Sequence, residues 1–343
     1  MLDSDVWTHP TRLDYPDIEA AAERITGRVR AVSVAAAQHG RRPEAETDTG
    51  ATWVALPTVD PAAAGLYFAL EFMQYTGTFK ARGAQNFIRA HLDAGSFPAA
   101  GVTIASGGNA GLACAWAARE AGVRATVFVP ETAPAVKVDR LRSYGADVRL
   151  VGSEYAEAAA ACAEFAESSG ALASHAYDDP LIAAGAGTVF TEILAQVPDL
   201  DTVVVSVGGG GLFAGVATAA TFHGVRTVAV EPQGSHAFNA ALEAGAPVDV
   251  TVDSVAADSL GARRATPLAL AAAQTDLVTS VLVSDPEIIA ARRHLWAEHR
   301  LVVEHAAATA LAGVHSSGGY TPEPGEKVAV VLCGANTGLG DLT

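Results

Sequence analysis

Two stretches of the sequence contain residue types that attach a cofactor to a protein. In the first, Lys80 follows a small turn, Thr76-Gly77-Thr78, and the aromatic Phe79, at the start of a helix predicted over 79–93. Thr78 can cap that helix. The positive end of a helix disfavours a charged ammonium group, and the neutral amine is the form that attacks an aldehyde. Although most lysines are solvated surface charges, this setting suits a lysine that forms a Schiff base.

The second stretch is a run of four glycines, Gly208 to Gly211, after an apolar strand predicted over 202–207. Consecutive glycine N–H groups can converge on an anion, and the following helix adds its positive end. A Schiff-base lysine and a phosphate loop are the two attachments that pyridoxal phosphate needs. The segment 209–214 also fits G-x-G-x-x-A, with Glu231 ending the next strand, which is the dinucleotide-binding fingerprint. A nicotinamide-dependent dehydrogenase is therefore an alternative, although it leaves the lysine stretch unexplained.

Two further segments follow predicted strands and could face a ligand. The segment Ser106-Gly107-Gly108-Asn109 opens a predicted helix, where Ser106 and backbone N–H groups could bind a carboxylate and Asn109 could bond a ring hydroxyl. An ordinary capped turn explains this segment equally well when it is taken alone. Cys333 ends the last predicted strand, where it could be an apolar filler or could face a cofactor.

The composition limits the classes of partner. The chain has 343 residues, which is typical of two lobes, and its formal net charge of −16 argues against nucleic acid or an anionic membrane surface. The three cysteines fit neither a zinc pattern nor a disulfide framework, as expected in a reducing cytoplasm. We see no signal peptide and no apolar run long enough to span a bilayer. The sequence therefore predicts a cytoplasmic protein that binds a small molecule.

Apolar periodicity predicts alternating strands and helices along most of the chain. The predicted strands cover 66–71, 101–105, 125–129, 147–151, 202–207, 225–230, 278–283 and 328–333. The predicted helices cover 16–39, 79–93, 109–121, 134–144, 154–169, 180–196, 212–222, 235–244, 265–273, 285–298 and 305–314, with a loop over 40–50. This alternation predicts an α/β fold with a parallel sheet flanked by helices.

Taken in order, four motifs resemble the fold type II pyridoxal-phosphate enzymes of the serine/threonine dehydratase family. The motifs are TGTFKARGA at 76–84, SGGNAG at 106–111, SVGGGG at 206–211 and CGAN at 333–336. The resemblance covers roughly residues 16–340 and leans toward the serine dehydratase branch. It implies a tryptophan-synthase-beta-like fold of two lobes with twisted, mainly parallel sheets. It also implies a small domain at 76–186 inserted into a large cofactor-binding domain made of 1–75 and 187–343.

The resemblance assigns cofactor-binding roles to single positions. Lys80 would hold pyridoxal 5'-phosphate covalently, with Phe79 packed on the ring. Asn109 would contact the ring hydroxyl, and Cys333 would pair with the pyridine nitrogen. The phosphate would lie on Gly208, Gly209, Gly210 and Gly211.

The resemblance also implies substrate and cation sites. The loop that closes on the substrate carboxylate would contain Ser106, Gly107, Gly108 and Asn109. Glu231 and Ser235 fall where some relatives bind a cation, so they are candidate ligands of a monovalent ion. Ala237 stands where relatives that bind a divalent cation carry aspartate, which argues against a magnesium site. Gly107 replaces a serine that the racemases of the family keep, which argues against racemisation.

The implied activity is the deamination of L-serine and L-threonine to a 2-oxo acid and ammonia, by a homodimer. A lyase of the same fold that acts on another β-substituted amino acid, such as 3-hydroxyaspartate, is an alternative. The dehydrogenase is a weaker one.

Overall fold

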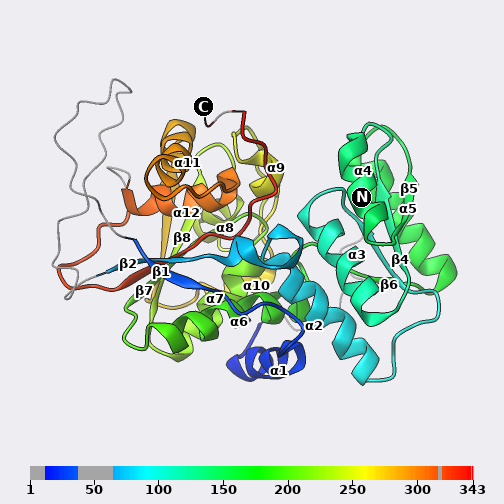
Figure 1. Ribbon diagram of the computed structural model, residues 1–343, viewed down its shortest axis with the longest axis horizontal. Coiled ribbons are helices and arrows are strands. Elements are labelled where there is room, and N and C mark those ends of the chain that lie inside the picture. Colours follow the sequence, from blue (N-terminus) through cyan, green and yellow to red (C-terminus); the bar gives the residue numbers. More distant parts are fainter. Residues whose placement is uncertain (1–11, 38–64, 316–318, 341, 343) are drawn as a thin grey trace.

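The computed structural model describes residues 12–37, 65–315, 319–340 and 342, which form an α/β structure with two sheets (Figure 1). The larger sheet has six strands in the order β1-β2-β10-β7-β8-β9, and the smaller has four in the order β5-β4-β3-β6. Every neighbouring pair is parallel except β1 and β2, which are antiparallel. The predicted α/β class with mainly parallel sheets is therefore confirmed.

The larger sheet owes its parallel arrangement to nearly continuous apolar strands. Its members are β1 (Val34–Ala36), β2 (Leu66–Ala69), β7 (Thr202–Ser206), β8 (Arg226–Pro232), β9 (Val278–Val283) and β10 (Val328–Val331). The central strands β10, β7 and β8 are rich in valine and almost entirely buried, which is typical of strands covered on both faces. Figure 1 shows α11 (Asp285–His299) and α12 (His305–His315) above these strands, and α6 (Pro180–Gln196) below. The carboxyl ends of the strands remain as the edge where a ligand can bind.

The smaller sheet has an apolar core of its own. Its strands are β3 (Val102–Ala105), β4 (Ala125–Val129), β5 (Asp147–Leu150) and β6 (Leu172–Ala173). Nearby helices are α2 (Lys80–Asp93), α3 (Asn109–Ala121), α4 (Ala135–Ser143) and α5 (Tyr155–Ser169). Ile104, Val127, Trp116 and Leu141 belong to a buried cluster separate from that of the larger sheet.

The remaining described elements surround the larger sheet. They are α1 (Tyr15–Ile25), α7 (Gly211–Phe222), α8 (Ala237–Ala244), α9 (Ala257–Leu260), α10 (Pro267–Ala272) and the short 3-10 helices η1 (Glu71–Met73) and η2 (Tyr75–Gly77).

One predicted helix was wrong in extent. The helix predicted over 16–39 ends at Ile25, because Gly27 turns the chain with φ of +72°. The segment Val34–Ala36 instead pairs with β2, a tertiary contact that local periodicity cannot reveal. The short strand β6 and helix α9 were also missed, while the other predicted elements are present with ends shifted by a residue or two. The loop predicted over 40–50 lies outside the described residues.

The predicted small domain contains all four strands of the smaller sheet, but its predicted end falls inside the continuous helix α6. Ion pairs of the buried Arg82 also cross this limit. Arg82 of α2 contacts Glu71 at 2.7 Å and Glu192 of α6 at 2.7 Å. The division at 76–186 stays a prediction.

Candidate active site

Lys80 is held by a strained turn that rests on the end of β10. Thr76 has φ of +63° and Gly77 has φ of +78°. These left-handed conformations turn the chain just before α2 begins. The Thr78 hydroxyl accepts the Lys80 backbone N–H at 3.1 Å, so the predicted cap is present. The Phe79 N–H donates to the Cys333 carbonyl at 3.0 Å. The lysine and the cysteine, far apart in the sequence, are therefore brought to one place.

The Lys80 amine lies among buried groups, although the residue as a whole keeps some exposure. Its Nζ donates to the Ala176 carbonyl at 3.2 Å. Burial lowers the pKa of Lys80 to about 8, against the opposing effects of Cys333 and Glu304. A substantial fraction of the amine is therefore neutral near pH 8, as nucleophilic attack on an aldehyde requires.

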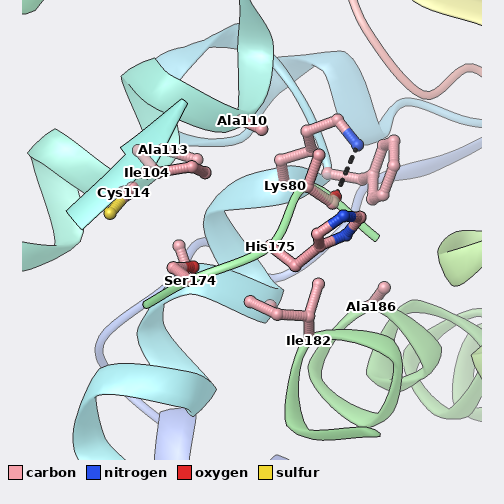
Figure 2. A pocket seen from close by; sticks show the side chains of 13 residues that line it. Lys80, Ile104, Ala110, Ala113, Cys114, Ser174, His175, Ile182 and Ala186 are labelled. Atoms are coloured by element: carbon pink, nitrogen blue, oxygen red, sulfur yellow. Dashed lines mark hydrogen bonds between the residues drawn. The ribbon is translucent and has the colours of Figure 1, made fainter. Parts of the chain in front are cut away.

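A cavity lies beside this amine (Figure 2). Its lining comes mainly from α2, α3, α6 and the segment 174–176, and most of the side chains are small and apolar. His175 lines the same cavity, and its Nδ1 accepts the N–H of Tyr177 at 3.3 Å and of Asp178 at 2.8 Å. Nδ1 must be unprotonated to accept these bonds, so the imidazole is neutral, and desolvation of the ring lowers the pKa of His175 in the same direction. It adds no positive charge next to Lys80.

The glycine run forms a tight loop between β7 and α7. Gly210 has φ of +102°, a conformation that suits glycine. A Cβ on Gly209 would lie 2.3 Å from the Tyr177 ring, and one on Gly210 would lie 2.4 Å from Ala269 Cβ. Within the described part of the chain, the N–H groups of Gly208, Gly209 and Gly210 have no hydrogen-bond partner. The loop is therefore able to donate several N–H groups to an anion at the start of α7.

Cys333 is buried at the carboxyl end of β10, beside the end of β7. Its Sγ lies 3.7 Å from the Ser206 hydroxyl, and only 3% of the residue is exposed. Burial, with Glu304 nearby, raises the pKa of Cys333 to about 12. The thiol is therefore neutral at physiological pH and suits a neutral partner for a ring nitrogen.

Asn109 is the first residue of α3, and its side chain is engaged with the larger sheet. Its Nδ2 donates to both carboxylate oxygens of Glu304, at 2.9 and 3.1 Å. Its Oδ1 accepts the Asn336 amide at 2.7 Å. The motif at 106–109 thus meets the CGAN motif, as a shared ligand site requires.

The other members of this segment, Ser106 to Gly108, lie directly before α3. The Ser106 hydroxyl accepts the Gly108 N–H at 3.3 Å. A Cβ on Gly108 would meet no atom within 4 Å, whereas one on Gly107 would lie 3.2 Å from Val129 Cγ1. The segment leaves open space on one side, which suits a loop that binds a substrate carboxylate.

The two predicted cation ligands are occupied by other bonds. Glu231 accepts the N–H groups of Phe238 at 2.8 Å and Asn239 at 2.7 Å, which ties it to the start of α8. Ser235 donates to the Leu260 carbonyl at 2.7 Å. The predicted cation site stays a prediction. The dehydrogenase alternative, however, loses the free carboxylate that would bind a ribose.

Three residues near Lys80 were not predicted as site residues from the sequence, namely Glu304, Asn336 and Tyr177. Glu304 directly follows two valines, and Asn336 closes the CGAN motif. A polar residue at the end of an apolar run was the available signal. Their mutual contacts depend on tertiary packing.

The residues present fit pyridoxal phosphate. Lys80 offers an amine that is readily neutral, and the glycine loop offers free N–H groups to a phosphate. Cys333 offers a neutral thiol beside Ser206, at the end of the strand that leads into the glycine loop. The fit rests on these features of the protein itself.

Comparison with known proteins supports the same reading. Residues 47–334 match the family described as "Pyridoxal-phosphate dependent enzyme". The chain is 37% identical to an L-threonine ammonia-lyase of Geobacter sulfurreducens over 79% of this chain and 67% of that protein. It is 38% identical to a phenylserine dehydratase of Ralstonia pickettii, over 79% and 82%. It is 35% identical to a human serine dehydratase-like protein, over 79% and 85%.

Solved structures agree on the fold. Maize serine racemase superposes with a TM-score of 0.82 at 29% identity, covering 96% of this chain and 95% of that one. The processed threonine deaminase isoform 2 of Solanum lycopersicum gives 0.78 at 27% identity, covering 98% and 89%.

Proposed function

This chain belongs to the pyridoxal-phosphate-dependent enzymes, and on that premise we propose that it deaminates β-hydroxy amino acids, with L-serine and L-threonine as the first candidates. The products are a 2-oxo acid and ammonia. The observation that carries the proposal is the buried Lys80 amine, whose pKa lies at about 8, close to a neutral Cys333 thiol. The names of the relatives, a threonine ammonia-lyase, a serine dehydratase-like protein and a phenylserine dehydratase, support the same class of reaction.

Each protein group has a task in this reaction. Pyridoxal phosphate, when bound, supplies the electron sink for negative charge at the substrate α-carbon. The glycine loop would hold the phosphate, and the start of α3 would hold the substrate carboxylate. The neutral Lys80 amine takes the α-proton, since a base with a pKa near the working pH transfers protons efficiently.

The remaining steps release the product. The β-hydroxyl leaves with a proton as water, and the enamine that results takes up water to give a 2-oxo acid and ammonia. A neutral thiol at Cys333 would leave the pyridine nitrogen of a bound cofactor unprotonated, which would restrain carbanion build-up at the α-carbon and favour elimination over racemisation.

A substrate panel tests the proposal. We expect L-serine and L-threonine to yield 2-oxo acids, because the segment before α3 leaves open space beside Gly108 for a small side chain. The measurement is kcat/KM for these two amino acids, phenylserine and 3-hydroxyaspartate, with D-serine formation followed in parallel. If only 3-hydroxyaspartate yields a 2-oxo acid, the assignment of L-serine and L-threonine as substrates is wrong. D-serine as the main product would show that the enzyme catalyses racemisation and not elimination.

Cys333 variants test the electronic argument. Cys333→Ser should keep elimination, because a hydroxyl is also a neutral partner. Cys333→Asp should lower kcat by at least about 10-fold, since a negatively charged carboxylate would stabilise the protonated form of the ring nitrogen. The checks are kcat and product identity by chromatography. A Cys333→Asp enzyme with the wild-type rate and product would contradict the role of the thiol.

We also propose that the protein is a cytoplasmic homodimer. Cys114, Cys162 and Cys333 are all buried and free, as expected in a reducing compartment. No helix in the described residues is both long and apolar enough to cross a bilayer. Light scattering on the purified protein would measure the oligomeric state.

A further inference from the structure

Glu304 is a buried carboxylate that no role assigned above uses. Only 5% of the residue is exposed, and it lies directly before α12. Its oxygens accept the two bonds from Asn109 and the backbone N–H of Asn336, the latter at 2.8 Å. A buried carboxylate with three donor contacts is fixed in both position and orientation.

Glu304, Asn109 and Asn336 form a closed ring of hydrogen bonds. The Asn336 amide donates to Asn109 Oδ1 at 2.7 Å and to the Thr76 carbonyl at 2.8 Å. Asn109 thus has a donor directed at a carboxylate and an acceptor directed at an amide. Turning its amide over would place two donors together and an oxygen against a carboxylate. The ring therefore permits one orientation of Asn109.

Two glycines leave room for the side chains of this hydrogen-bonded ring. A Cβ on Gly334 would lie 2.7 Å from Glu304 Oε2, and a Cβ on Gly77 would lie 2.9 Å from Asn336 Oδ1. The Glu304 N–H donates to the Gly334 carbonyl at 2.9 Å. Two glycines are needed where the ring meets the lysine turn and the cysteine strand.

We propose that Glu304 is a positioning residue of the cofactor site. Its carboxylate fixes the amide of Asn109, and through it the start of α3, against the strand end that carries Cys333. The hydrogen-bonded ring joins Asn109 to Glu304, 195 positions away in the sequence, and to Asn336, 227 positions away. It therefore couples segment 106–109, which would bind the substrate carboxylate, to the strand end that would face the cofactor. This inference rests on the proposed function in one respect, namely that Asn109 faces the bound cofactor.

The test compares cofactor affinity in Glu304→Gln with that of the wild type, by fluorescence titration of apoprotein with pyridoxal phosphate. Glutamine keeps the size but turns an N–H₂ group toward the donors of Asn109 or Asn336. We expect affinity to fall by about 10-fold or more, the scale of a hydrogen bond to a charged group. Glu326→Gln is the matched control, because Glu326 is also a buried, hydrogen-bonded carboxylate with 8% exposure but lies at the start of β10. It should leave affinity unchanged.

Non-additivity separates positioning from general stability. If Glu304 acts through Asn109, Asn109→Ala should add little to Glu304→Gln. Hydrogen exchange in apoprotein should show the Asn336 amide protected in the wild type and exposed in Glu304→Gln. Glu304→Asp, which keeps the carboxylate, should retain more cofactor affinity than Glu304→Gln. If the glutamine variant does not fold, the same titration is made with Glu304→Asp.

Two results would overturn the inference. One is wild-type cofactor affinity in Glu304→Gln, and the other is a loss that adds fully to that of Asn109→Ala. Both are measured without any substrate, so failure of the serine or threonine assignment would leave this test intact.

Discussion

Replacing Lys80 by alanine should abolish covalent capture of pyridoxal phosphate and lower turnover by about 10²–10⁴-fold or more, the range contributed by a positioned proton-transfer group. The variant loses both the amine that attacks the aldehyde and the base that takes the α-proton. The sequence contains three lysines, Lys80, Lys137 and Lys327, so the site of attachment is readily identified. The measurement is borohydride reduction of the wild type and the variant, followed by peptide mapping and assay of 2-oxo acid.

Lys137→Ala is the control for this experiment. Lys137 forms an exposed ion pair with Asp258 at 2.9 Å, and its loss should leave cofactor capture intact. Label found on Lys137 or Lys327 of the reduced wild type would refute the assignment of Lys80. Retained label in Lys80→Ala would refute it as well.

The same capture reaction should depend on pH in a defined direction. The pKa of Lys80 is lowered to about 8, and only the neutral amine attacks. The rate should therefore rise as pH increases toward 8 and level off above it. Capture that keeps rising toward the ordinary lysine pKa, about 10.4, would show that the amine is not desolvated in solution.

Gly209→Ala should weaken the binding of pyridoxal phosphate by about 10-fold or more, because the added methyl forces the loop or the Tyr177 ring to move. Its Cβ would lie 2.3 Å from that ring. Overpacking of this kind costs about 1–3 kcal/mol, and a displaced loop no longer points its free N–H groups at one anion. Fluorescence titration of the apoprotein measures the affinity, and titration with NADH tests the dinucleotide alternative in parallel.

The matched control for the loop is Gly313→Ala in α12. Its Cβ would meet Val230 Cγ2 at 2.4 Å, a contact as close as that at Gly209 but within the core of the larger sheet. We expect it to lower the melting temperature with little change in cofactor affinity. Equal affinity in wild type and Gly209→Ala would show that the phosphate lies elsewhere.

Local sequence signals sufficed for most of the elements. Valine runs predict buried parallel strands such as β7 and β10, because a strand covered on both faces needs apolar residues throughout. The helix predicted over 16–39 failed because Val34–Ala36 has little preference of its own and becomes a strand only by pairing with β2. The two residues of β6 are too short to show any period.

The residue types of the candidate site were also visible in the sequence, although the glycine run alone fitted a dinucleotide-binding loop as well and only the four motifs together favoured pyridoxal phosphate. The sequence by itself determined the family and the α/β class, and it predicted the roles of the lysine and the glycine loop, because each motif consists of residues adjacent in the chain. Only the tertiary structure decided that Glu304, Asn109 and Asn336 form one ring and that Cys333 lies beneath the lysine turn. It also decided the lowered pKa of Lys80, because burial is set by elements that are distant in sequence. Contacts between strand ends arise from how the sheet is assembled, and no local pattern of residues encodes them.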